Sequence, residues 1–117
     1  MGTAPTNETG KLHAKDGEGK DLTIEAEFCA SWGYSGIVGQ FKSFFLNKLS
    51  DIGYNVNYTL IPKQGIKGEY FVYKLEGEKR KIIFSNNKKV HENDNPVFGN
   101  QINEENFDSV LKKLEEN

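Results

Sequence analysis

The sequence feature that most restricts the fold is a change of hydrophobic period between Leu22 and Leu60. From Leu22 to Phe28, apolar residues alternate with threonine and glutamate, which is typical of a strand with one buried face. A stripe at steps of three or four residues then predicts a helix that ends at Gly53. Alternation returns over Tyr54–Leu60, with Tyr54, Val56, Tyr58 and Leu60 on the buried side. The helical stripe consists of Val38, Phe41, Phe45, Leu49 and Ile52. If the two strands are neighbours, this βαβ unit is parallel, with a right-handed crossover.

The second half of the chain adds a hairpin and a final helix. Strands are expected over Glu69–Leu75 and Lys81–Phe84, because Gly77 lies in the short polar connection between them. Ser85–Gln101 is expected to be a long surface connection, with an edge strand or a packed corner at Val97–Phe98. Asn103 is the expected cap of the last helix. The predicted fold class is α/β, a two-layer sandwich of a four-stranded mixed sheet and two helices in the order β-α-β-β-β-α.

Length and composition favour one domain preceded by a tail. Residues 1–20 are mostly polar or glycine and are expected to be a flexible tail, so the domain spans 21–117. No apolar stretch has the length of a membrane span, and no signal-peptide pattern is present, so a cytoplasmic location is expected. A net charge of −2, without a basic block, argues against nucleic acid as a partner. His13 has no partner histidine nearby. His91 has Glu92 and Asp94 beside it, which could indicate a metal site or a base, but solvent-facing loop residues are expected there. We expect no metal, no resident cofactor and a monomer.

Cys29, the only cysteine, lies where the first predicted strand stops and the helix is about to start near Ser35. Unpaired N–H groups and the positive end of a helix dipole favour a thiolate, the form of cysteine that attacks disulfides. A single cysteine excludes an internal disulfide and a cysteine-based metal cluster. The alternative is an inert buried cysteine.

The segment Cys29-Ala-Ser-Trp-Gly-Tyr34 resembles the Cys-x-x-Sec-Gly-Tyr or Cys-x-x-Cys-Gly-Tyr motif of the selenoprotein W and selenoprotein T family. The predicted order of strands and helices from Asp21 onward is also similar to that of this family. The resemblance implies a thioredoxin-like fold and a redox protein in which Cys29 is the nucleophile. It places Trp32 at the position of the selenocysteine or second cysteine. Supporting positions implied by the resemblance are Ser31, Gly33, Tyr34 and Pro62, the last at the place of the cis-proline loop; an ordinary trans proline stays an alternative.

Trp32 determines which thiol chemistry the motif allows. A dithiol oxidoreductase needs a second sulfur or selenium atom to release the mixed disulfide, and an indole has neither. Cys29 would therefore act as a monothiol, with an outside thiol such as glutathione completing the exchange and serving cell redox homeostasis. A second explanation is that Trp32 stands where a native selenocysteine stood, because UGA, the selenocysteine codon, is read as tryptophan in some genetic codes and by occasional misreading. The competing functional class is a non-catalytic interaction module that binds protein partners through an apolar patch of Trp32, Tyr34, Ile37 and Val38.

Overall fold

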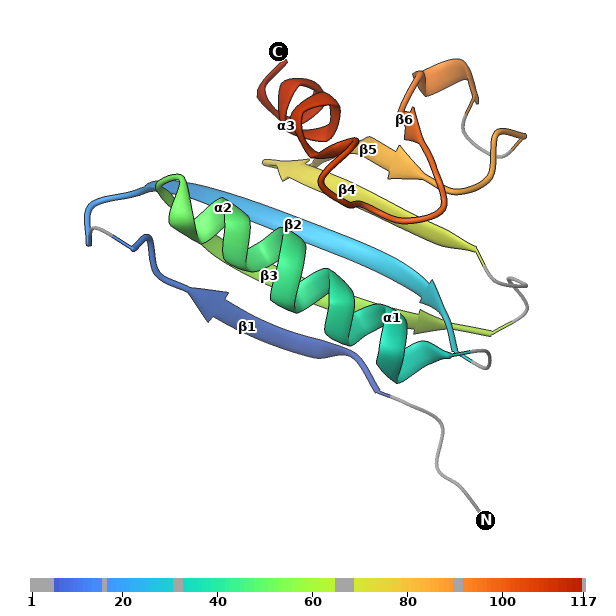
Figure 1. Ribbon diagram of the computed structural model, residues 1–117, viewed down its shortest axis with the longest axis horizontal. Coiled ribbons are helices and arrows are strands. Elements are labelled where there is room, and N and C mark those ends of the chain that lie inside the picture. The colour runs from blue at the N-terminus through green and yellow to red at the C-terminus, as the bar shows by residue number, and fades with distance from the viewer. Residues whose placement is uncertain (1–5, 16, 31–32, 65–68, 90–91, 117) are drawn as a thin grey trace.

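In the computed structural model, a mixed β-sheet is covered on one face by helices (Figure 1). The structure describes residues 6–15, 17–30, 33–64, 69–89 and 92–116. The strands are β1 (Glu8–Leu12), β2 (Lys20–Cys29), β3 (Tyr54–Lys63), β4 (Tyr70–Glu76), β5 (Lys79–Ser85) and β6 (Val97–Phe98). The helical segments are α1 (Tyr34–Gln40), the π-helix η1 (Phe41–Leu46), α2 (Asn47–Asp51), the 3-10 turn η2 (Glu92–Asp94) and α3 (Phe107–Glu115).

The predicted βαβ unit forms the centre of the sheet. β2 and β3 are parallel, with Ile24 beside Tyr58, and the helix that connects them packs on their inner face. β4 joins β2 antiparallel and forms the predicted hairpin with β5, whose turn contains Gly77 at φ 63°. The α/β class is therefore confirmed, and the described sheet has the strand order β1-β3-β2-β4-β5-β6.

Two further strands extend the predicted four-stranded sheet, so that the described sheet has six strands. β6 pairs with β5 in parallel at one edge, where the sequence predicts an edge strand or a corner. β1 pairs antiparallel with β3 at the other edge, so the predicted flexible tail is wrong for Glu8–Leu12. The ring of Tyr58 lies over Gly10, so a Cβ at this position would force the end of the tyrosine side chain to move. Ala14, also within the predicted tail, is buried and its N–H donates to Asn55.

One continuous helix runs from Tyr34 to Asp51 through α1, η1 and α2. Its start near Ser35 and its end before Gly53 are as predicted, and its N-cap residue is Gly33. The prediction that Ile52 belongs to the buried stripe is wrong: it lies beyond α2 and is 48 % exposed. Phe45 and Leu46 of the π-helix are both buried in the core.

The core fills the space between the helices and the inner face of the sheet. Phe107 of α3 packs edge-on against Phe44 and Phe45 of η1, which places α3 on the same face as the long helix. The prediction that Asn103 caps the last helix is wrong, because α3 begins at Phe107 and its N-cap residue is Asn106. Asn103 instead accepts hydrogen bonds from the N–H groups of Glu105 and Asn106 in the turn before α3. Within the described ranges, no helix has both the length and the apolar character that crossing a bilayer requires.

Tyr70 is the residue of this core whose polar group is least well accommodated. Its ring packs against Phe28, Phe41 and Phe84, yet its hydroxyl, with almost no solvent access, has no hydrogen-bond partner among the described residues. Burial raises the pKa of Tyr70 well above its ordinary value. An unsatisfied buried hydroxyl destabilises the folded state by about 1–3 kcal/mol.

Replacing Tyr70 by phenylalanine is therefore expected to raise the free energy of unfolding by about 1 kcal/mol, because the desolvated hydroxyl is removed and the ring stays. Urea denaturation followed by circular dichroism measures the change. Tyr73→Phe is the matched control, because its hydroxyl donates to Glu27 and its loss should be destabilising. A Tyr70→Phe protein less stable than the wild type would contradict the prediction.

Candidate functional site

Cys29 is the last residue of β2 and lies at the carboxyl ends of the parallel strands β2 and β3. Its N–H donates to the carbonyl of Glu69 at 3.1 Å, and the next N–H, that of Ala30, donates to the carbonyl of Lys63 at 3.0 Å. Cys29 is thus held between the end of β3 and the start of β4. The residue is only 3 % exposed, so a reagent reaches the sulfur only after neighbouring groups move aside.

The alternation of β2 places Cys29 on the outer face of the sheet, away from the helices. Ile24, Ala26 and Phe28 belong to the core under the helices. Glu25, Glu27 and Cys29 occupy the opposite positions, since successive side chains of a strand point to opposite faces. The charged groups that share a face with Cys29 therefore come from the sheet rather than from the helix that begins at Tyr34.

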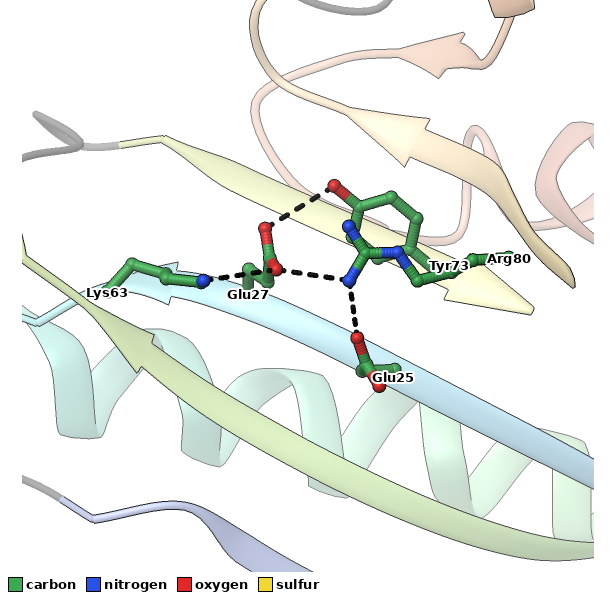
Figure 2. A network of polar contacts seen from close by, with 5 residues as sticks. All are labelled: Glu25, Glu27, Lys63, Tyr73 and Arg80. Carbon is green, nitrogen blue, oxygen red and sulfur yellow. Dashed lines mark hydrogen bonds and ion pairs between the residues drawn. The ribbon is translucent and has the colours of Figure 1, made fainter. Parts of the chain in front are cut away.

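A network of five polar side chains occupies this outer face, as Figure 2 shows. Arg80 joins two carboxylates, with Nη1 2.6 Å from Oε1 of Glu25 and 3.3 Å from Oε2 of Glu27. Its guanidinium lies 3.9 Å from the ring centroid of Tyr73. Tyr73 donates its hydroxyl to Oε1 of Glu27 at 3.4 Å, and the ammonium of Lys63 lies 3.6 Å from Oε2 of Glu27. Two carboxylates and two cations balance one another in charge.

The acidic side chains of this network are more deeply buried than the basic ones. The side chains of Glu27 and Glu25 are 11 % and 19 % exposed, whereas those of Lys63 and Arg80 are 45 % and 43 % exposed. The carboxylates therefore lie against the sheet and the cations lie over them. An incoming molecule meets the two cations first.

Burial, followed by the negative charge of Glu27, raises the pKa of Tyr73 to about 12 from an ordinary value of 10.0. The protonated phenol is thus favoured by folding. This contribution to stability is complete below pH 10, where the unfolded phenol is also protonated, and it is lost as the pH rises from 10 to 12. We expect the free energy of unfolding to fall over this range, and to fall less in Tyr73→Phe. Urea titrations across the range measure both; equal losses in the two proteins would contradict the expectation.

The structure brings some of the sequence-predicted residues together. Pro62 is the register partner of Phe28, so it lies one position from the level of Cys29, but it belongs to β3 and its peptide bond is trans. The strand predicted to end at Leu60 continues to Lys63, so Pro62 lies within β3 and not in a loop. Gly33, at φ 61°, precedes the helix in a conformation that favours glycine. Ser31 and Trp32 lie outside the described residues.

The described part of the predicted apolar patch packs inward. Val38 is buried in the core, and Tyr34 and Ile37 are partly buried against it. Tyr34 makes an edge-on contact with Phe28, with ring centroids 6.3 Å apart, and burial raises its pKa. Ile52, at the far end of the helix, is the exposed large hydrophobic residue of the described chain.

The polar network itself was not predicted from the sequence. In the sequence, Glu25 and Glu27 are typical of the solvent-facing side of a strand, and Arg80 is typical of a short, solvent-facing basic run between two strands. The signal that could have indicated the network is the pairing of acidic outer positions on β2 with a tyrosine and an arginine on the hairpin. That signal needs the register between β2 and β4, in which Glu25 lies beside Tyr73 and Glu27 beside Phe71.

Two other features of the fold, possible metal-ligand groups and the hollows, were considered as candidate sites. No group of three histidine, cysteine or acidic side chains that could hold a metal ion is found in the residues that the structure covers. A hollow of about 680 Å³ is lined by the loop before β2, the turn after α2, the start of β3 and Glu115. It lies at the Lys20 end of β2, opposite to the end that carries Cys29. The outer face around Cys29 is therefore the candidate site.

Comparison of the chain with family models, with curated proteins and with solved structures finds no match in any of the three.

Proposed function

We propose that this chain is a thiol-disulfide exchange protein of the selenoprotein W/T-like type, with Cys29 as its nucleophile. The observation that carries the proposal is the position of Cys29 at the carboxyl ends of β2 and β3, where parallel α/β sheets place their reactive groups. The motif that follows Cys29 leads into the helix that connects these strands. A cytoplasmic, monomeric protein without a resident cofactor is part of the proposal.

The arrangement of elements supports a thioredoxin-like sandwich. β2, the long helix, β3, β4, β5 and α3 follow the order β-α-β-β-β-α, and both helices pack on one face. β1 and β6 then add one strand at each edge of the four central strands.

The proposed exchange uses one protein sulfur and glutathione. The Cys29 thiolate attacks the glutathione sulfur of a mixed disulfide between glutathione and another thiol; a protein–glutathione disulfide forms, the original S–S bond breaks, and the other thiol leaves as a thiolate that takes a proton from water. A second glutathione thiolate then attacks the protein–glutathione disulfide on the glutathione sulfur. This step regenerates the Cys29 thiolate and releases glutathione disulfide. Trp32 takes no part in electron transfer, because its indole cannot form a disulfide.

Burial of the sulfur makes the rate of exchange the decisive measurement. The full chain is incubated with glutathione disulfide, and adduct formation is followed by intact mass in the native state and in urea. We expect one adduct in the native protein, its removal by excess glutathione, and no adduct in Cys29→Ser. A native protein that stays unmodified while the urea-unfolded chain reacts completely would overturn the proposal, because the sulfur would then be a structural one.

A further inference from the structure

Lys63 is the cation that the sheet places beside Cys29. The two residues are register partners in the parallel pair of β2 and β3. Partners in neighbouring strands share a face and lie about 5 Å apart in the backbone. The ion pair between Lys63 and Glu27 confirms that the lysine lies on the outer face, since Glu27 also contacts Tyr73 and Arg80 there.

Lys63 is held less tightly than the other cation of the network. Its ammonium lies 3.6 Å from Glu27, beyond hydrogen-bonding distance, and makes no hydrogen bond to a described residue. Arg80, by contrast, contacts both Glu25 and Glu27 and also stacks on Tyr73. Figure 2 shows Lys63 reaching the network from the side opposite to Arg80. With a side chain 45 % exposed, Lys63 retains donors for a ligand that approaches Cys29 from solvent.

The carboxylates near Cys29 are either paired with other side chains or shielded from solvent by them. Glu27 is 11 % exposed at its side chain and is enclosed by Tyr73, Arg80 and Lys63. Glu69, whose carbonyl accepts the N–H of Cys29, has its carboxylate 2.8 Å from the side-chain amide of Asn87. The charge nearest to solvent on the described outer face beside Cys29 is therefore positive.

We infer that Lys63 is a specificity residue, which selects disulfides of net negative charge, of the glutathione type, over disulfides of net positive charge. The inference rests on the proposed function and names its substrate class. Lys63 binds a carboxylate of the disulfide and positions the S–S bond over Cys29. The bond changes are those of the exchange given above, and Lys63 itself is neither oxidised nor reduced.

The test compares three disulfides that differ in charge: glutathione disulfide is anionic, cystamine is cationic and bis(2-hydroxyethyl) disulfide is neutral. Rates of adduct formation are measured for the full chain by intact mass. At low salt, Lys63→Met should lower the ratio of the glutathione disulfide rate to the cystamine rate by about 3- to 10-fold, as expected for one charge near the surface. Lys63→Arg should retain most of the preference, and added salt should weaken it in the wild type.

Lys88→Met is the matched control, because it removes the same charge from an exposed position outside the network and should leave the ratio unchanged. The neutral disulfide separates charge selection from a general change in thiol reactivity, which would alter all three rates together. An equal ratio in wild type and Lys63→Met, with all three disulfides reacting, overturns the inference and leaves the proposed function standing. Failure of every disulfide to react with the native wild type overturns the proposed function, and the inference falls with it.

Discussion

Replacing Phe41 by alanine is expected to lower the free energy of unfolding by about 4 kcal/mol. Phe41 has no solvent exposure and begins the π-helix at the centre of the core. Its ring centroid lies 5.4 Å from that of Phe28, 5.3 Å from that of Phe45 and 5.9 Å from that of Tyr70. Truncation removes these contacts at once and leaves a cavity between helix and sheet. Urea denaturation at constant pH measures the loss.

Phe44→Ala provides the comparison for Phe41, because the two residues have the same chemistry in the same helix. Phe44 is only partly buried, with contacts to Phe107 and Lys48 at the margin of the core. Its truncation is expected to lower the free energy of unfolding by about 1–2 kcal/mol. Equal losses for the two variants would show that the core is not centred on Phe41.

Arg80→Ala is expected to lower the free energy of unfolding by about 2 kcal/mol. The substitution leaves Glu25 without its contact at 2.6 Å and leaves the nearly covered Glu27 with only Tyr73 and Lys63. Partial exposure of Arg80 keeps the loss below that of a fully buried ion pair. Chemical denaturation of the purified variant tests the expectation.

A double-mutant cycle separates the charge interaction from the packing of the Arg80 side chain on Tyr73. In a Glu25→Gln/Glu27→Gln background, loss of Arg80 should be about half as destabilising, because no carboxylate charge is then left uncompensated. An unchanged effect in that background would assign the stability to the stacking on Tyr73 alone.

The central elements were predictable because their hydrophobic patterns follow from the faces that they bury. The alternation over Leu22–Phe28 and the helical stripe from Val38 correspond to β2 and the long helix, and the glycines at positions 53 and 77 end an element or turn a hairpin. These signals are local, so a single sequence contains them. The asparagine at position 103 is also a local signal, but its side chain stabilises the turn before α3 and does not cap the helix.

The edge strands and the polar network on the outer face were not predictable, because they depend on pairing between segments that are far apart in sequence. β1 has one large apolar residue, Leu12, and exists as a strand because its backbone pairs with β3. The position of Glu27 among Lys63, Tyr73 and Arg80 depends on pairings between strands far apart in sequence. The alternation along the strand predicts a solvent-facing Glu27, and this side chain becomes covered only when the neighbouring strands assemble. The place of Cys29 on the outer face follows from counting along β2, but the charges beside it come from β3 and β5.

The pairing of β1 with β3 has a practical consequence for shortened versions of the protein. A truncation at residue 21, the start suggested by composition, would uncover the Tyr58 ring that lies over Gly10 and leave β3 with an unsatisfied row of amides and carbonyls. An exposed strand edge of this kind promotes the addition of a strand from another molecule, and therefore aggregation. Expression clones for spectroscopy should therefore retain Glu8–Leu12.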